Sequence, residues 1–128
     1  MRLLLDTHVA LWAISDDRRL PRSARAMIAS PDNAVHVSAV SVWEIAIKHA
    51  RYPRDMPVSG SDALRWFRDS GYLMIPVTPE HAEQVESLPD LHADPFDRML
   101  VAQAMAEPFR FMTRDATIAR YSDTVLLI

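Results

Sequence analysis

The sequence has no cysteine, no long apolar run and only one lysine among its 128 residues. Without cysteine, a disulfide framework and a thiolate metal site are both excluded. No apolar segment approaches the ~20 residues of a membrane span, and Asp6 interrupts the short apolar segment Leu3–Leu5 too early for a signal peptide. The five histidines lack the spacings typical of zinc sites. We therefore expect a soluble, cytoplasmic domain with no membrane segment.

The basic residues are almost all arginine, because Lys48 is the only lysine among 14 of them. Against 17 acids they leave a formal charge of −3, which by itself argues against a nucleic-acid-binding protein. If several acids surround a divalent cation, however, the remaining surface is net basic. Arginine binds phosphate as a planar bidentate donor, although genomic base composition explains the arginine content equally well.

Short apolar runs alternate with helical patterns along the whole chain, and 49% of the residues are apolar. This pattern predicts a single domain over residues 1–128. Strands are expected at residues 2–5, 34–37, 72–76, 109–113 and 125–128. Helices are expected at residues 9–14, 23–29, 40–50, 62–70, 79–87, 95–106 and 116–121. We therefore predict an α/β fold of three layers, with a mostly parallel central sheet of four to five short strands and helices on both faces.

The segment Asp94–Ala106 carries a strong helix start signal, with Asp94 as N-cap, Pro95 at the first helical position and Asp97 in the first turn. After Arg98 the sequence is apolar on nearly every face, which is typical of a helix buried inside a domain. Two acids at the start of such a helix have a structural explanation, because they cap the helix and complement its dipole. They also have a functional one, because acids occupy similar positions elsewhere in the chain.

Four acids are expected at or near junctions between a strand and a helix: Asp6, Glu44, Asp97 and Asp115. In a parallel sheet these junctions lie at one edge, where ligands of α/β proteins bind. Carboxylates brought within a few ångströms cannot all ionise without a counter-charge. The pattern therefore predicts a site for a hard divalent cation such as Mg²⁺, which prefers oxygen ligands.

The segment Ser41–Glu44 also has a purely structural interpretation. It has the spacing of a capping box, in which the acid only stabilises the start of a helix. Trp43 and Ile47 share one helix face and are predicted to lie in the core. Trp66 and Phe67 are predicted to lie in the core as well, with a partner-binding patch as the alternative.

Four segments bear on the family of the protein: Leu3–His8, Val37–Ala46, His92–Ala104 and Thr113–Asp115. In this order they resemble the PIN-domain ribonucleases, and most closely the VapC-type toxins of bacterial toxin–antitoxin pairs. The resemblance covers essentially the whole chain. It implies a PIN-like domain and a Mg²⁺- or Mn²⁺-dependent endoribonuclease that acts on single-stranded RNA. It also implies a homodimer and a small antitoxin protein that covers the active site, often with a basic side chain among the acids.

The resemblance assigns roles to ten residues. The implied catalytic and metal-binding residues are all acids: Asp6, Glu44, Asp97 and Asp115. The implied supporting residues are small or acidic: Thr7, Ser38, Asp94 and Thr113. The implied phosphate contacts are both arginines: Arg98 and Arg114. The implied reaction is metal-assisted hydrolysis of a phosphodiester, in which the acids position the ions and electrostatic stabilisation supplies most of the catalysis.

Two alternatives belong to other classes of protein. Phosphate-handling α/β domains also bind Mg²⁺, but a phosphatase of the haloacid dehalogenase type has a second Asp where this chain has His8, and a receiver domain has a late lysine, whereas Lys48 is the only lysine. A non-catalytic interaction module would work through Trp12, Trp66 and Phe67, and its acids would only cap helices. Such a module would show no increase in melting temperature with Mg²⁺ or Mn²⁺.

Overall fold

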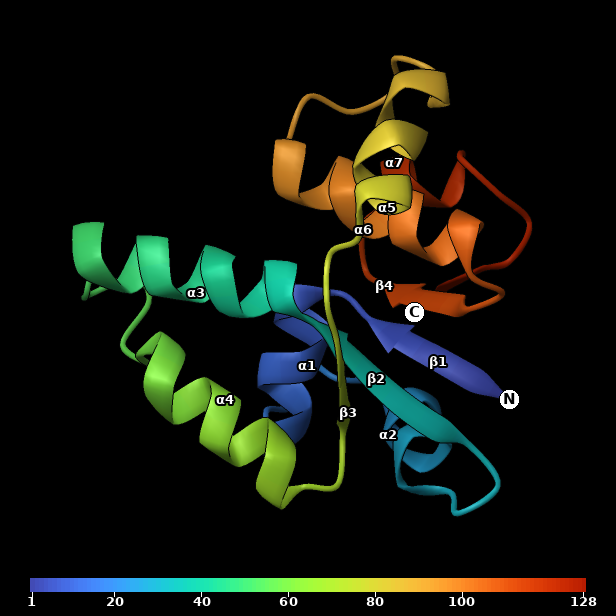
Figure 1. Ribbon diagram of the computed structural model, residues 1–128. Coiled ribbons are helices and arrows are strands. Elements are labelled where there is room, and N and C mark those ends of the chain that lie inside the picture. The colour runs from blue at the N-terminus through green and yellow to red at the C-terminus, as the bar shows by residue number, and fades with distance from the viewer.

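The computed structural model describes residues 1–128 as a five-stranded, all-parallel sheet with the order β3-β2-β1-β4-β5 (Figure 1). The strands are Arg2–Leu5 (β1), Ala34–Ser38 (β2), Leu73–Ile75 (β3), Arg110–Thr113 (β4) and Val125–Leu127 (β5). The predicted α/β class is confirmed, and the sheet is wholly rather than mostly parallel. Because all five strands run the same way, their carboxyl ends meet at one edge.

Seven helices and one short 3₁₀ turn connect the strands. The helices are Thr7–Ile14 (α1), Arg22–Ala29 (α2), Ala39–Arg51 (α3), Gly60–Asp69 (α4), Pro79–Gln84 (α5), Pro95–Ala106 (α6) and Ala116–Ala119 (α7), and the 3₁₀ turn is Val85–Ser87 (η1). Figure 1 shows α1, α2 and α4 on one side of the sheet and α5, α6 and α7 on the other. The predicted helix at 79–87 is divided between α5 and η1, β1 and α6 have the predicted bounds, and the other boundaries differ from the predicted ones by at most two residues.

The central strand β1 is buried on both faces. Leu3 and Leu5 pack in the core that contains α1 and α4, whereas Leu4 packs in the opposite core with α6, and all three side chains are 0% exposed. Burying each leucine stabilises the fold by about 2 kcal/mol relative to an exposed position. The continuous apolar run thus places β1 in the middle of the sheet, and Asp6 directly at the edge where the strand ends.

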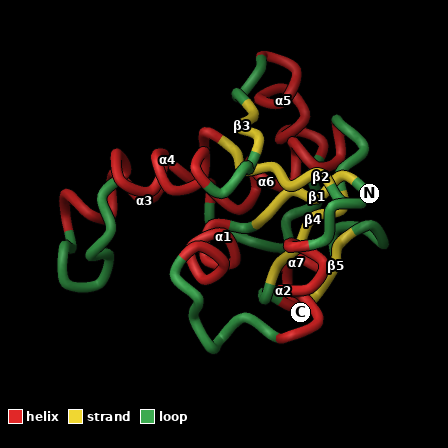
Figure 2. Tube along the Cα trace, turned by 90° about the horizontal axis from the view of Figure 1, so that it is seen from below, coloured by secondary structure: helices red, strands yellow, loops and turns green.

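Helices α3 and α4 lie side by side and extend beyond the sheet (Figure 2). Gly60 permits this approach, because a Cβ atom at its position would lie 2.9 Å from Cβ of Ala46 on α3. Gly71 follows α4 with φ of 83°, a conformation that favours glycine, as expected for the residue that ends this helix.

The structure contradicts two predictions for α3. The helix begins at Ala39 with Ser38 as its N-cap, so Ser41 lies inside the helix and forms no capping box. Glu44 accordingly stands in the second helical turn rather than the first. Trp43 and Ile47 are 61% and 37% exposed, because this face of α3 extends past the sheet. Trp43 instead packs edge-on against Phe96, with ring centroids 5.1 Å apart.

Phe67 is fully buried, as predicted, whereas Trp66 is 38% exposed and was wrongly placed in the core. None of the helices combines the length and the apolar character that a bilayer-spanning segment requires.

Candidate functional site

The carboxyl edge of the sheet holds a polar cavity of about 340 Å³. Five of its nine lining residues are acids, and only one is apolar: Asp6, His8, Val9, Glu44, Lys48, Asp94, Asp97, Arg114 and Asp115. The structure therefore brings together the four acids predicted from the sequence, and Asp94, which the resemblance implied as a supporting residue, lines the cavity with them. They come from four separate segments of the chain, which the parallel topology places side by side.

Asp6 is held where β1 ends and α1 begins. Its Oδ1 accepts the backbone N–H of Thr7 at 2.8 Å, and its Oδ2 accepts the hydroxyl of Thr113 at 2.6 Å. Burial raises the pKa of Asp6, and these two hydrogen bonds oppose that shift without cancelling it. Thr113 thus acts on the cavity by orienting an acid.

Glu44 is fixed by one partner on each oxygen. The Thr7 hydroxyl donates to Oε1 at 2.8 Å, and the ammonium of Lys48 donates to Oε2 at 2.5 Å. Burial opposes the charge on Lys48, but the hydrogen bond and the charge of Glu44 outweigh it and raise the pKa of Lys48. The side chain of Glu44 is only 4% exposed, so it is a buried carboxylate with its own cation.

Asp97 has no such partner. Burial, followed by the charges of Asp6, Asp94 and Glu44, raises its pKa to about 7. The one basic side chain in contact with its carboxylate is the imidazole of His92, whose Nε2 lies 3.3 Å from Asp97 Oδ2 and which carries a charge only when it is protonated.

Asp94 has a structural role. Its Oδ1 accepts the backbone N–H groups of Phe96 at 2.8 Å and Asp97 at 3.2 Å, so it caps α6 as predicted. Its carboxylate nevertheless lines the cavity and contributes to the negative potential there.

Asp115 is paired with His92. Nε2 of His92 lies 2.8 Å from Asp115 Oδ2, while Nδ1 accepts the N–H of Asp94, which places the imidazole proton of a neutral ring on Nε2. The hydrogen bond to Asp115 raises the pKa of His92. Burial alone would raise the pKa of Asp115, but the bonds from His92 and from the backbone of Thr117 outweigh it and lower the pKa.

The donor set is suited to a hard divalent cation. Carboxylate oxygens of Asp97 and Asp115 lie within 4.8 Å of each other, and the other acids add further carboxylate oxygens. A cation would also relieve the repulsion that raises the pKa of Asp97.

Two predicted site residues lie elsewhere. Ser38 caps α3 and donates to Gln103 Oε1 at 2.5 Å, in a buried contact outside the cavity lining. The guanidinium of Arg98 donates to the carbonyls of Pro89 and Val85 and is likewise absent from the cavity lining.

Arg114 does line the cavity, and its Nη1 donates to the carbonyl of Arg19 at 2.8 Å. Sequence reasoning missed Lys48 and His92 as site residues. The available signals were the spacing of four residues between Glu44 and Lys48 on one helix, and the position of His92 just before the cap of α6.

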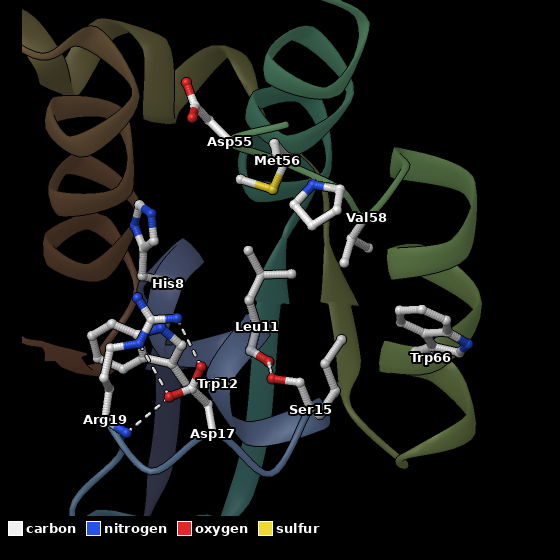
Figure 3. Close-up of a pocket in the computed structure, with 12 residues that line it drawn as sticks. His8, Leu11, Trp12, Ser15, Asp17, Arg19, Asp55, Met56, Val58 and Trp66 are labelled. Atoms are coloured by element: carbon white, nitrogen blue, oxygen red, sulfur yellow. Dashed lines mark hydrogen bonds and ion pairs between the residues drawn. The ribbon is translucent and has the colours of Figure 1, made fainter. Parts of the chain in front are cut away.

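A second cavity, of about 310 Å³, adjoins the acidic one, because His8 lines both. Figure 3 shows Leu11, Met56 and Trp66 around it, with Arg19 bound to Asp17 at one end. This groove is more apolar than the acidic cavity, with half of its twelve lining residues hydrophobic.

The comparisons with known proteins agree with this geometry. A family model of the PIN domain matches residues 3–123, so the chain belongs to the PIN-domain family. Within that family it is of the VapC type. It is 30% identical over 118 residues to Ribonuclease VapC22 of Mycobacterium tuberculosis, covering 88% of this chain and 86% of that protein. The family resemblance noted in the sequence is thereby confirmed.

Two solved structures share the fold. One is VapBC2 from Rickettsia felis bound to a DNA fragment from their promoter, with a TM-score of 0.72 and 16% identity over 100% of this chain and 98% of that one. The other is a toxin–antitoxin complex from Klebsiella pneumoniae, with a TM-score of 0.66 and 18% identity over 97% and 95% of the two chains. At these identities the likeness concerns the fold alone.

Proposed function

We propose that the protein is a cytoplasmic, metal-dependent endoribonuclease toxin of a toxin–antitoxin pair, which hydrolyses RNA phosphodiester bonds with Mg²⁺ or Mn²⁺. The observation that carries this proposal is the acidic cavity, where Asp97 lies among other carboxylates and has a pKa of about 7. The relative named Ribonuclease VapC22 supports it. Membership of the PIN-domain family leaves the receiver and phosphatase alternatives without support.

The residues that would hold the cation are Asp6, Glu44, Asp97 and Asp115. A bound divalent cation supplies Lewis acidity, which activates water and stabilises negative charge on a phosphodiester under attack. The remaining chemistry belongs to the chain itself. Thr7 and Thr113 fix the orientation of Glu44 and Asp6 through their hydroxyls, and such fixed geometry avoids reorganisation during the reaction.

Arg114 and His92 complete the proposed site. Arg114 lines the cavity with a guanidinium that can contact an RNA phosphate, whereas the contacts of Arg98 with two loop carbonyls argue against the same role for that residue. His92 carries a proton on Nε2 and holds Asp115, so it orients that carboxylate.

We assign the groove beside the acidic cavity to the antitoxin. The groove is apolar along Leu11, Met56 and Trp66 and reaches the acids at His8. A partner segment with apolar side chains and one basic residue fits both parts, because the basic residue can neutralise the acids. The expected homodimer is also part of the proposal, and light scattering of the purified protein tests it.

The experiment is cleavage of a mixed single-stranded RNA pool by antitoxin-free protein, with Mg²⁺ or Mn²⁺ and with EDTA. We expect cleavage only with metal, and a loss of about 1000-fold or more in Asp97→Asn, since metal and electrostatic stabilisation supply several kcal/mol of catalysis. Asp69→Asn is the matched control, because Asp69 is exposed at the end of α4, away from the cavity.

Two outcomes would contradict the proposal. Cleavage that survives both EDTA and Asp97→Asn would rule out the acid-cluster mechanism. Absence of cleavage, together with no metal-dependent rise in melting temperature, would favour the non-catalytic interaction module instead.

A further inference from the structure

Lys48 is a cation that lines the acidic cavity and is paired with one of its acids. It lies one helical turn after Glu44 on α3, and its ammonium contacts Glu44 Oε2 at 2.5 Å. The other oxygen of Glu44 is already bound by the hydroxyl of Thr7. Lys48 therefore holds the carboxylate oxygen that Thr7 leaves free.

A lysine is better suited than an arginine to a contact with a carboxylate that can be broken. An ammonium is a compact, strongly hydrated charge on a flexible stem, whereas a guanidinium grips a carboxylate through a planar fork. The chain has arginine at every other basic position and its only lysine at this one. The side chain of Lys48 is 37% exposed, so its ammonium has a path to solvent, whereas Glu44 is enclosed.

A divalent cation on Glu44 would stand close to this ammonium. Mg²⁺ binds oxygen at about 2.1 Å, and the ammonium lies 2.5 Å from the same carboxylate oxygen. Two positive charges at such a separation repel each other, and the burial of Glu44 weakens the screening of this repulsion by water. The pair and the metal complex are therefore antagonistic states of one carboxylate.

We propose that Lys48 is a built-in counter-ion that competes with a divalent cation for Glu44. Its role is one of positioning and regulation: it neutralises a buried acid, and it raises the concentration of cation at which the site fills. This inference rests on the proposed metal site, and it adds a regulator of that site supplied by the chain itself.

The test is binding of Mn²⁺ to the full-length, antitoxin-free protein, measured from the electron paramagnetic resonance signal of free Mn²⁺ without RNA. We expect Lys48→Met to bind Mn²⁺ about tenfold more tightly than the wild type, because the competitor is gone. Lys48→Arg keeps the charge, so we expect no gain in affinity. Lys48→Gln serves as a second neutral variant if the methionine variant does not fold.

Arg114→Met is the matched control for the general effect of removing a positive charge. Arg114 lines the same cavity but has no recorded bond to a carboxylate, so we expect a gain of less than about threefold. In a Glu44→Gln background, Lys48→Met should change the affinity by less than about twofold, because the competition requires Glu44.

Each other outcome overturns the inference. Unchanged or weaker binding in both neutral variants would mean that Lys48 is a structural or metal-supporting partner. A gain in Mn²⁺ affinity that equals the gain of Arg114→Met, or that persists in the Glu44→Gln background, would mean that Lys48 acts only through a long-range charge effect. If the wild type binds no Mn²⁺, the metal site itself is wrong, whereas binding of equal strength in all variants refutes only the role of Lys48.

Discussion

Glu44 and Asp97 lie in one cavity, but their charges are balanced in opposite ways. Glu44 has a hydroxyl on one oxygen and an ammonium on the other. Asp97 has only the edge of an imidazole at 3.3 Å, and its pKa rises to about 7. The fold thus supplies a hydrogen-bond donor and a counter-charge to Glu44, whereas Asp97 lacks such partners and is available to a ligand.

This difference shows that the acids of one cluster can have different roles. A carboxylate with internal partners contributes fixed geometry, and a carboxylate without them contributes affinity for a cation, because binding relieves its repulsion. The following predictions separate these two roles, beginning with the largest expected effect.

Replacing the two acids by their amides should affect stability differently in the absence of divalent cations. At pH 8 we expect Asp97→Asn to raise the melting temperature by about 5 °C, because it removes a repelled charge. Glu44→Gln should change it by less than about 2 °C, since the lost pair with Lys48 is offset by reduced repulsion of the other acids. Circular dichroism measures both, and an equal rise in the two variants would invalidate the comparison.

The stability of the metal-free protein should depend on pH through Asp97. Its pKa is 3.8 in the unfolded reference and about 7 in the fold, so the folded protein retains a proton that the unfolded chain has lost between these values. Stability must therefore fall as pH rises from about 4 to about 7. The raised pKa values of Asp6 and His92 act in the same direction.

Thermal denaturation from pH 5 to pH 8 in EDTA measures this slope. Asp97→Asn should make the stability depend less on pH, but some dependence should remain. Saturating Mg²⁺ should add more stability at pH 8 than at pH 5, because the ionised acid binds the cation. A wild-type stability that rises with pH in EDTA would contradict the assignment.

Removing the hydroxyl partner of Glu44 should have a smaller effect. Thr7→Val deletes the bond to Oε1 and keeps the backbone N–H that binds Asp6. We expect a loss of about 1 kcal/mol in the free energy of unfolding, measured in urea, since a buried acceptor loses a donor. The pH slope due to Asp97 should remain, and Thr117→Val provides a control at a less buried threonine whose hydroxyl has no recorded bond to an acid.

The smallest effect is expected at His92. Burial and the neighbouring acids raise the pKa of Asp97, and the imidazole of His92 lowers it by a smaller amount. His92→Gln removes that imidazole. We expect the midpoint of Asp97 titration to rise by about half a pH unit, measured by carboxyl NMR. A fall in that midpoint would mean that His92 does not favour the ionised form.

The sequence predicted the elements that depend on local signals. The apolar run predicts strand β1, and the N-cap and the proline predict the start of α6. Because the strands of the sheet are parallel, their carboxyl ends then bring Asp6, Asp97 and Asp115 together. The partners of the acids were harder to predict, because a spacing of four residues does not show that Lys48 binds Glu44, and because His92 contacts Asp97 and Asp115 only once the chain has folded.

The incorrect predictions have physical reasons. Helical periodicity placed Trp43 in the core, but periodicity identifies an apolar face without showing whether another element covers it. Ser38, at the end of β2, takes the capping role that the local spacing had suggested for Ser41. Arg98 directly follows Asp97 in sequence, yet its long side chain reaches two carbonyls of the segment before α6 and does not line the cavity.

The bond between Asp6 and Thr113 joins residues 107 positions apart. Strand β1, which ends just before Asp6, also depends on β4 for one of its two ladders, since Leu4 pairs with Phe111. During synthesis the N-terminal acids therefore emerge from the ribosome long before the residues that hold them in place. A nascent chain therefore carries most of the acids of the site but not their arrangement, which is complete only when the last strands have been released.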